Sequence, residues 1–561
     1  MAKDGVRTGG QLLMDCLINL GASKAFGVPG ESYLAVLDAM VDRRDEFDLV
    51  LCRQEGGAAY MAAAWAKLTG DPGLCFVTRG PGATNAAVGI HTAMQDSLPM
   101  LLFVGQVGSD VAGREAFQEV DYPAFFGPIA KWVVQIDHVN RVPEIISRAW
   151  SVALSGRPGP VVVALPEDML VDVSSAAPCT AVEIPEPAPS SGALAKLTDM
   201  LNAAERPVII VGGTRWQPES ARAIEAFATA HNIPVVAAFR FHDIIDNHCD
   251  AYVGDAGIGM NPYMKALLGN ADLIFAINIR FGEFTTNDYK LFDAPKMAAK
   301  LVHSHCSDDE IGKLYAADLP LHAGPNVLAD ALSSLQLSRS SEQSDWVQAA
   351  RANYLASLKM PPQTGDVDMA QIIPQIEASL PEDAIITHGA GNFAIWSNKF
   401  MQYGPQQRLL APQSGSMGFG LPAALAAKVY DGSRFVLCFA GDGDFQMNGN
   451  ELGTALQAGL HPIILILNNS SYGTIRMHQE RTYPARVLGT KIVNPDYVTL
   501  AAAYGFHGER VTRTDEFAGA YARALAATTG AYPVGAIIEI IVATEAISPQ
   551  TTISALREAT R

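Results

Sequence analysis

Short, almost wholly apolar runs alternate along the chain with longer segments of helical periodicity. The runs are rich in Val, Ile, Leu and Phe and are bounded by Gly, Pro or Asn; examples are GLCFVTRG (73–80), MLLFVGQV (100–107), PVVVALP (160–166), RPVIIVGG (206–213), DLIFAINI (272–279), FVLCFAGDG (435–443) and PIILILNN (462–469). Continuous apolar runs of this length are typical of parallel strands buried on both faces. The pattern therefore predicts an α/β fold with parallel sheets.

Two stretches without helical periodicity interrupt this alternation. Residues 174–192 are rich in Pro and Ser, and residues 337–345 are polar and rich in Ser, so both are interpreted as linkers. A chain of 561 residues is too long for one core. We expect three doubly wound parallel-sheet domains, at 1–175, 192–335 and 365–545, followed by a tail at 546–561.

Composition and charge narrow the class of protein. Apolar residues make up 49% of the chain and charged residues 17%, as in a globular protein. The net charge of −18 disfavours nucleic acid or an anionic membrane as a partner. No apolar run reaches the roughly 18 residues of a membrane span, and the first residues lack a signal-peptide pattern. The seven cysteines are scattered without metal-ligand spacing, so we expect a cytoplasmic enzyme with reduced thiols.

The stretch GDGDFQMNGNELG, residues 441–453, is dense in small, acidic and amide residues and follows an apolar run. A calcium-binding EF-hand loop is one hypothesis for such a stretch. A loop that starts at Asp444 places Ala455 where a bidentate glutamate is needed, and one that starts at Asp442 places Met447 where glycine is needed. The EF-hand hypothesis therefore fails on its ligands.

A magnesium–diphosphate cradle is the better interpretation of this stretch. Asp442 ends one apolar run and Asn469 ends the next, and the carboxyl ends of neighbouring parallel strands meet at one edge of a sheet. A carboxylate and an amide oxygen suit Mg²⁺ that keeps water and phosphate oxygens as its other ligands. Gly441 and Gly443 would let the backbone approach a phosphate closely. By itself, however, GDG is also common in plain strand-end turns.

The wider sequence resembles a known family. GDG followed by residues 444–467 and then NN is the signature of enzymes that use thiamine diphosphate, and the resemblance covers nearly the whole chain. The branch it resembles most is that of the acetolactate (acetohydroxyacid) synthase large subunits. Further matching segments, in the family's order, are FGVPGE (26–31), RQEGGAAYMAAAWAKLTG (53–70), RGPGATNAAVGIHTAMQDSLPM (79–100), GQVGSDVAGREAFQEVD (105–121) and QSGSMGFGLPAA (413–424).

The resemblance implies an N-terminal pyrimidine-binding domain, a middle domain and a C-terminal diphosphate-binding domain. It implies that Glu55 is the catalytic glutamate that hydrogen-bonds the pyrimidine N1′, and that Asp442, Asn469 and the backbone carbonyl of Ser471 hold Mg²⁺. The positions it implies for cofactor contacts are Pro29, Gly391, Asn392, Phe393, Gly415, Met417, Gly441, Gly443, Asp444, Tyr472, Gly473 and Thr474. Among these, Met417 would support the bent form of thiamine diphosphate.

Substrate and flavin positions are carried over in the same way. The implied substrate-pocket residues are Glu31, Phe117, Gln118, Lys131 and His478. In the middle domain, Arg280 and Phe281 stand where acetolactate synthases bind FAD. Gly282 and Glu283 depart from the family's pattern there, so FAD, an adenine nucleotide and an empty site remain open.

The activity that the resemblance implies is that of a thiamine-diphosphate- and Mg²⁺-dependent carboligase. It would decarboxylate a small 2-oxo acid such as pyruvate and join the fragment to a carbonyl acceptor. The family's sites lie between the first domain of one subunit and the third domain of its partner, which implies a homodimer or a dimer of dimers. A simple 2-oxo acid decarboxylase or acyl lyase is the alternative within the family, and a non-catalytic paralogue that binds a cofactor or a partner is the alternative outside it.

Overall fold

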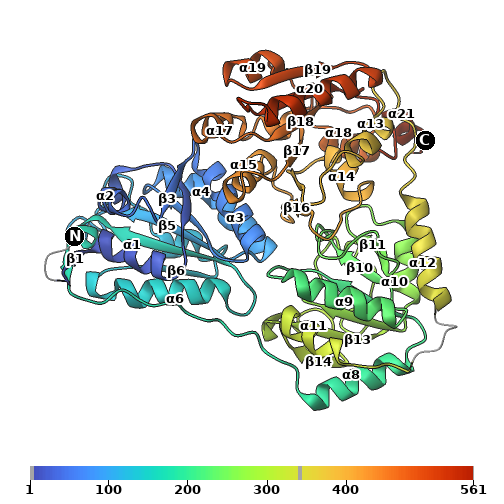
Figure 1. Cartoon of the computed structure of the whole chain (residues 1–561), viewed down its shortest axis with the longest axis horizontal. Helices are drawn as coiled ribbons and strands as arrows, with labels where there is room; N and C mark the ends of the chain where they lie inside the picture. The colour runs from blue at the N-terminus through green and yellow to red at the C-terminus, as the bar shows by residue number, and fades with distance from the viewer. Residues whose placement is uncertain (1–4, 339–343, 560–561) are drawn as a thin grey trace.

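The computed structural model describes residues 5–338 and 344–559. Most of the second predicted linker, 337–345, lies outside these ranges. Figure 1 shows three domains arranged as a triangle, and each domain is built around one six-stranded sheet in which all neighbouring strands are parallel. The predicted α/β class with three parallel-sheet domains is confirmed.

The first domain has the strand order β3-β2-β4-β5-β7-β6. Its strands are β2 (Lys24–Gly27), β3 (Asp48–Leu51), β4 (Gly73–Val77), β5 (Met100–Gln106), β6 (Trp132–Gln135) and β7 (Pro160–Pro166), with a small pair β1 (Arg7–Thr8) and β8 (Val173–Ser174) beside them. Its helices are α1 (Gly9–Asn19), η2 (Glu31–Tyr33), α2 (Leu34–Asp42), α3 (Glu55–Thr69), α4 (Pro81–Asp96), α5 (Tyr122–Phe126), η3 (Val139–Arg141), α6 (Val142–Leu154) and α7 (Glu167–Val171).

The middle domain has the strand order β11-β10-β9-β12-β13-β14. Its strands are β9 (Pro207–Val211), β10 (Val235–Ala238), β11 (Tyr252–Ala256), β12 (Leu273–Ile277), β13 (Lys300–His305) and β14 (Leu319–His322). Its helices are α8 (Ser191–Ala203), α9 (Pro218–Ala230), α10 (Pro262–Asn270), η4 (Asp308–Glu310), α11 (Pro325–Ser333) and α12 (Ser344–Ser357). Residues 175–190, within the first predicted linker, form neither helix nor strand.

The third domain has the strand order β16-β15-β17-β18-β20-β19. Its strands are β15 (Ile385–His388), β16 (Arg408–Leu410), β17 (Val436–Gly441), β18 (Ile463–Asn468), β19 (His507–Val511) and β20 (Ala536–Ile541). Its helices are α13 (Met369–Glu377), η6 (Asn392–Ala394), α14 (Ile395–Lys399), α15 (Gly420–Tyr430), α16 (Asp442–Phe445), η7 (Gly449–Glu451), α17 (Leu452–Ala458), α18 (Gly473–Thr482), α19 (Tyr497–Ala503), η8 (Thr514–Glu516), α20 (Phe517–Thr529) and α21 (Ile553–Ala559).

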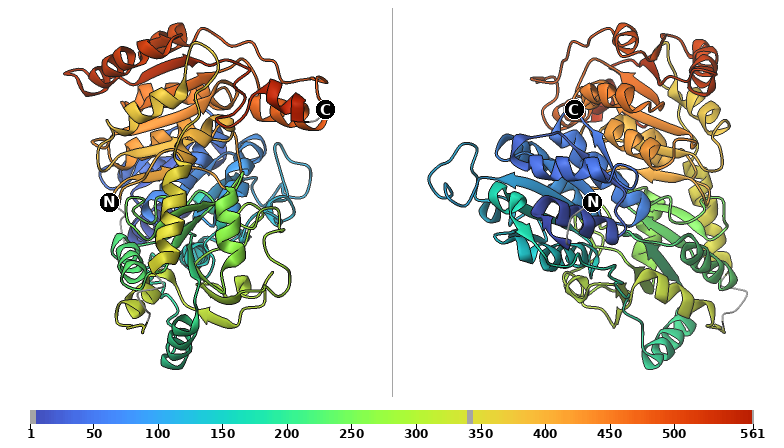
Figure 2. Two further views of the ribbon diagram at one scale, coloured as in Figure 1. Left: turned by 90° about the vertical axis from the view of Figure 1, so that its right-hand side faces the viewer. Right: turned by 60° about the vertical axis from the view of Figure 1, so that its left-hand side comes forward.

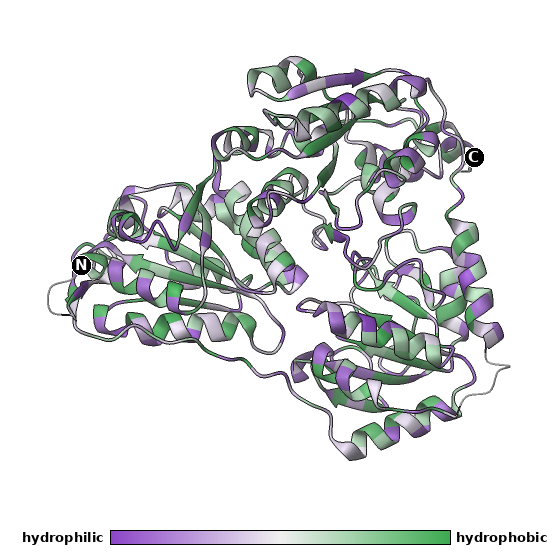
Figure 3. Cartoon of the chain, viewed as in Figure 1, coloured by the Kyte–Doolittle hydropathy of each residue, from purple (hydrophilic) through white to green (hydrophobic). Residues whose placement is uncertain are grey.

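Successive side chains along a strand point to opposite faces of its sheet, so each sheet is packed on both sides. In β4, Cys75 packs into a cluster on one face of the sheet and Phe76 packs into a second cluster on the other face. A strand buried on both faces must be apolar at nearly every position. Figure 3 shows hydrophobic strands inside all three domains. In the described ranges, no helix combines the length and apolarity that a membrane crossing requires.

The first and third domains share one hydrophobic cluster. It runs from Tyr60 and Ala63 in α3 to Leu421 and Leu425 in α15. The rings of Tyr60 and Phe419 meet edge to face with centroids 5.4 Å apart. Figure 2 shows this close packing from two further directions, and it also shows the segment 107–121 standing out from the first domain. The packing fixes how α3 lies against the third domain.

Each sheet has a topological switch point, where the strand order reverses. These points lie between β2 and β4, between β9 and β12, and between β15 and β17. In open α/β sheets, ligands bind at the carboxyl ends of the strands beside such a point. Three places in the molecule therefore follow from topology alone as candidate binding sites.

Candidate functional site

The third domain presents the predicted cradle beside its switch point, at the ends of β17 and β18. β17 and β18 pair in parallel with Gly441 opposite Leu467, so Asp442 and Asn469 follow neighbouring strand ends. The Asn494 side chain joins the two strand ends, because its Nδ2 donates to Asp442 Oδ2 (2.7 Å) and to Asn468 Oδ1 (2.9 Å). Burial is the main cause that raises the pKa of Asp442.

Two glycines of the cradle have no room for a side chain. A Cβ at Gly443 would lie 2.5 Å from the Tyr472 ring, and one at Gly473 would lie 2.9 Å from Asn469 Nδ2. Gly473 is the first residue of α18, so its N–H has no partner within the helix. Bare backbone beside a helix N-terminus is suited to bind phosphate oxygens.

Two hydroxyl groups beside the cradle are buried without a hydrogen-bond partner among the described residues. They are Ser471 Oγ and Thr490 Oγ1, and the segments that carry them are joined by a 2.8 Å bond from Tyr472 N to Thr490 O. Buried polar groups are rarely left unpaired. The orphaned hydroxyls, the glycines and the Asp442 carboxylate together fit a hydrated divalent cation and a diphosphate. In the described ranges, no cluster of three His, Cys, Asp or Glu side chains could hold a metal.

Asp444 ties two loops of the third domain together. Its Oδ1 accepts hydrogen bonds from Ala390 N (3.0 Å) and Gly418 N (2.9 Å). Burial raises the pKa of Asp444 to about 7. Oδ1 of Asp444 therefore connects the loops that hold Gly391 and Met417.

The loop after β15, which carries Gly391 and Asn392, is hydrogen-bonded to Thr474 in α18 and to Ile547. Asn392 N donates to Thr474 Oγ1 (2.9 Å), and Asn392 Nδ2 donates to Ile547 O (2.8 Å). The Phe393 ring lies over Gly391 and Gly441, since a Cβ at either glycine would fall within 2.7 Å of it. The expected contact residues after β15 and β17 are thus brought together.

Glu55 is the first residue of α3 in the first domain. Asn85 Nδ2, from α4, donates to Glu55 Oε2 over 2.9 Å. A buried third-domain residue holds the start of this helix: Glu451 accepts from Arg53 N (3.1 and 3.2 Å) and from Gln54 N (2.9 Å). Sequence reasoning missed Glu451 and Asn85, and nothing in their spacing marks them.

The first domain also holds the loop that carries Gly415 and Met417. Asp96, the last residue of α4, accepts from Gln413 N (2.8 Å) and Ser414 N (3.1 Å). Gly415 adopts a left-handed backbone with φ 69°. Burial raises the pKa of Asp96. Asp96 was not predicted as a site residue, although it lies within a segment that carries the family resemblance.

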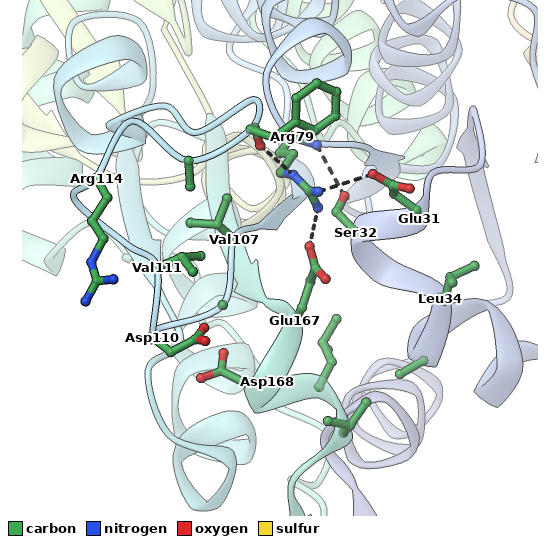
Figure 4. Close-up of a pocket in the computed structure, with 16 residues that line it drawn as sticks. Glu31, Ser32, Leu34, Arg79, Val107, Asp110, Val111, Arg114, Glu167 and Asp168 are labelled. Carbon is green, nitrogen blue, oxygen red and sulfur yellow. Dashed lines mark hydrogen bonds and ion pairs between the residues drawn. The ribbon is translucent and has the colours of Figure 1, made fainter.

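A cavity of about 840 Å³ lies at the switch point of the first domain. Two of the expected pocket residues line it, Glu31 after β2 and Phe117 in the segment 107–121. Gln118 follows with φ 64°, and its Cβ would be 2.8 Å from a Cβ at Gly80. Figure 4 shows Glu31 and Arg79 in direct contact at this cavity. Pro29 precedes them in the sequence and is exposed.

The other expected pocket residues lie elsewhere. Lys131 does not line the cavity; its Nζ donates to the carbonyl oxygens of Ser155 and Arg157, and burial lowers its pKa to about 8. His478 is exposed on α18 in the third domain. Within one chain, therefore, the structure brings Glu31 and Phe117 to one cavity but not Lys131 or His478.

A second cavity, of about 350 Å³, lies at the switch point of the middle domain. Arg280 lines it and donates from Nη1 to Gln95 O over 2.6 Å. Phe281 turns away, and its ring packs against His303 and Tyr315 with centroids 5.1 and 5.2 Å apart. The loop at residues 254–262 does not line this cavity. Only one of the two expected flavin contacts is thus available.

Comparison with known families gives three matches, one in each domain. Residues 7–125 match "Thiamine pyrophosphate enzyme, N-terminal TPP binding domain", and residues 194–332 match "Thiamine pyrophosphate enzyme, central domain". Residues 389–536 match "Thiamine pyrophosphate enzyme, C-terminal TPP binding domain". The order of the matches is the order expected from the sequence.

The chain is also similar to several acetolactate synthase large subunits. It is 32% identical over 521 residues to that of Parasynechococcus marenigrum, covering 90% of this chain and 83% of the relative. It is 31% identical over 512 residues to the isozyme 2 large subunit of Escherichia coli, covering 91% of each chain. With the large subunit of Lactococcus lactis it shares 32% over 507 residues, covering 89% of this chain and 87% of the relative.

Proposed function

The chain belongs to the thiamine pyrophosphate enzymes, and from this premise we propose that it is a thiamine-diphosphate- and Mg²⁺-dependent carboligase. It releases carbon dioxide from a pyruvate-like 2-oxo acid and joins the remaining acyl fragment to a carbonyl acceptor. The similarity to acetolactate synthase large subunits supports this reaction type.

The cradle of the third domain would hold the cofactor. Asp442 and Asn469 would bind Mg²⁺ through side-chain oxygens, and Ser471 would bind it through its carbonyl. The backbone at Gly443 and Gly473 would receive the diphosphate. The chemistry supplied by bound thiamine diphosphate is a carbon nucleophile for the 2-oxo acid and a place for the electron pair that carbon dioxide leaves behind.

The hydrogen bond from Asn85 to Glu55 is the observation that best supports catalysis. It occupies Oε2 and fixes the orientation of the carboxylate. Oε1 lies toward Gly82, where an added Cβ would be 3.4 Å away. Glu55 would therefore use Oε1 to exchange a proton with the pyrimidine N1′, as a positioned general acid–base group does.

We also propose a homodimer in which each site lies between two subunits. Within one chain, no hydrogen bond or ion pair of the described residues joins Glu55 to Asp442 or Asn469. Near the cradle, Leu488 and Val493 are 83% and 91% exposed. Large exposed apolar side chains of this kind are typical of a surface that a partner covers.

Flavin stays outside the proposed function. Arg280 offers a cation, but Phe281 is committed to ring contacts inside the middle domain. The residues therefore fit FAD only in part, and we derive no step from it. A purified preparation that is colourless, gains no flavin absorbance on incubation with FAD and is fully active is the expected result.

Product analysis tests the proposal. The native protein is incubated with thiamine diphosphate, Mg²⁺ and pyruvate, with and without an added aldehyde, and carbon dioxide and all products are quantified. A carboligase forms acetolactate or an acyloin, whereas a simple decarboxylase forms acetaldehyde alone. Absence of carbon dioxide from every 2-oxo acid tested, despite cofactor binding, would instead indicate a non-catalytic paralogue.

A further inference from the structure

Arg79 lies in the wall of the first-domain cavity, just after β4, and its guanidinium group contacts three separate segments. Nε donates to Phe117 O (3.0 Å), Nη2 donates to Glu31 Oε1 (3.2 Å), and Nη1 donates to Glu167 Oε1. The side chain of Arg79 is 9% exposed, whereas those of Glu31 and Glu167 are 66% and 45% exposed. Figure 4 shows the three side chains converging on one point.

This arrangement uses three of the five N–H groups of Arg79, and two of the three acceptors are carboxylates that balance its charge. A 2-oxo acid is usually recognised through its carboxylate, for which a forked arginine is the best partner. Here every guanidinium nitrogen already has a protein acceptor. A substrate carboxylate would have to displace Glu31 or Glu167, or bind a remaining N–H beside both of them, and each of these carboxylates brings its own negative charge to the guanidinium.

The remaining charges of the cavity do not favour binding of a substrate carboxylate either. The lining contains four carboxylates, Glu31, Asp110, Glu167 and Asp168, and two guanidinium groups, Arg79 and Arg114. In Figure 4, Arg114 lies at the outer rim and points away from Arg79. An anionic acceptor entering near the Pro29 loop would therefore be repelled before it reached a free cation.

The apolar lining of the cavity suits an uncharged acceptor better than an anionic one. Apolar side chains line the same cavity, and among them Leu34 is 61% exposed and Phe117 is 71% exposed. Both project from segments that Arg79 helps to hold, because Phe117 O accepts from Nε and Arg79 N donates to Ser32 Oγ (3.3 Å). Arg79 is thus a positioning residue for the apolar part of the cavity.

We infer that the acceptor selected by this cavity is an uncharged aldehyde, not a second 2-oxo acid, and that Glu31 sets this choice by occupying Arg79. The inference rests on the proposed carboligase function. In the reaction, a bond forms between the acyl carbon of the donor and the carbonyl carbon of the aldehyde. The aldehyde oxygen gains a proton, the donor loses carbon dioxide, and the product is a 2-hydroxy ketone without a carboxylate.

A competition experiment tests this choice. The enzyme with thiamine diphosphate and Mg²⁺ receives pyruvate and butanal together, and the ratio of mixed acyloin to acetolactate is measured. The native protein should form mainly the acyloin. Glu31→Gln frees Nη2 of its anionic partner, so acetolactate should gain about tenfold relative to the acyloin, the value of one charge-assisted hydrogen bond.

Two further variants make the result specific. Glu144→Gln removes an exposed carboxylate of the same domain that pairs with Arg141 outside the cavity, and it should leave the ratio unchanged. The double variant Glu31→Gln/Arg79→Gln lacks the freed guanidinium, so the gain in acetolactate should disappear. A gain that persists in the double variant would show that Arg79 does not bind the acceptor's carboxylate and would overturn the inference.

Failure of the inference and failure of the proposed function have different signatures. If carbon dioxide is released and the native protein forms mainly acetolactate, or if Glu31→Gln leaves the ratio unmoved, the acceptor assignment alone is wrong. If no 2-oxo acid yields carbon dioxide, or if acetaldehyde is the sole product with both acceptors present, the carboligase function itself is wrong.

Discussion

Asn85 in α4 donates a 2.9 Å hydrogen bond to Glu55 at the start of α3. One carboxylate oxygen is therefore held by an amide of the same domain. The neighbouring Gly82 leaves the other oxygen uncrowded. Because Asn85 holds one oxygen of this carboxylate, only the other oxygen is free to exchange a proton with a ligand.

Glu55→Gln should keep the fold and the binding of cofactor while losing turnover. The amide cannot exchange the proton, and removal of a general acid–base group costs about 10²–10⁴-fold in rate. Turnover is measured together with cofactor affinity, and Glu46→Gln, an exposed acid of the same domain, is the control. A Glu55→Gln protein within a factor of two of native turnover would contradict the assignment.

Mixing two inactive variants should restore activity if sites form between subunits. A heterodimer of Glu55→Ala and Asp442→Ala combines one intact first domain with one intact third domain at one of its two interfaces. In a homodimer of either variant, every site lacks Glu55 or Asp442. Activity after subunit exchange is the measurement, and an inactive mixture whose heterodimer is demonstrated by mass would place both residues in a site within one chain.

Asp442→Asn should weaken Mg²⁺ and thiamine diphosphate together. The substitution removes the only carboxylate among the three proposed ligands, so the positive charge of the metal is compensated less well. Cofactor affinity is titrated with and without Mg²⁺. The native protein should show a large metal effect and the variant a small one; equal effects would mean that the metal lies elsewhere.

Gly57→Ala should destabilise the protein although alanine normally favours a helix. The added Cβ in α3 would lie 2.4 Å from Glu451 Oε1, and Glu451 is fully buried. Overpacking of this kind costs about 1–3 kcal/mol. Gly192→Ala in α8 meets no atom within 4 Å and is the control. The thermal midpoint should fall for the first variant and hold or rise for the second, and the opposite order would show that Glu451 moves aside freely.

His388 should make the cofactor-free protein less stable as pH falls. Burial lowers its pKa from 6.5 to about 3, with Nδ1 2.8 Å from Gly389 O and Nε2 2.9 Å from the Asn398 side chain. Below pH 6.5 the unfolded chain takes up a proton that the folded one refuses, so stability is lost by up to about 1.4 kcal/mol per pH unit as the pH falls toward 3.

The variant His388→Gln isolates this effect because it cannot titrate. It loses packing at every pH but escapes the protonation cost. The difference in thermal midpoint between native protein and variant should therefore be largest at pH 7.5 and narrow at pH 5. A difference that stays constant would show that His388 takes up a proton in the folded chain as readily as in the unfolded chain.

The sheet pattern could be predicted because burial on both faces leaves a continuous apolar signal. FVLCFAGDG and PIILILNN are adjacent strands of one sheet, as expected, and the three parallel-sheet domains follow from the same signal. A strand that must exclude water on both sides leaves little freedom in its composition, so its type can be identified without knowledge of its neighbours.

Contacts between distant segments could not be predicted in this way. Glu451 binds backbone N–H groups of Arg53 and Gln54, and a backbone donor has no residue identity that a sequence could show. Arg79 and its two carboxylates come from three segments that are distant in the sequence. Lys131 and Phe281 illustrate the converse, because their positions match a family pattern while their side chains point into other contacts.

The bond between Glu451 and the start of α3 has a consequence for synthesis of the chain. Gln54 and Glu451 are separated by 397 positions. At about 5–20 residues per second, a ribosome needs roughly 20–80 s to travel between them. The helix that begins with Glu55 is made early, yet the backbone N–H groups of Arg53 and Gln54 before it meet Glu451 only when the third domain has emerged. A nascent chain halted before residue 451 would carry a first domain with this helix start unfinished, and such intermediates are the ones that chaperones are expected to bind.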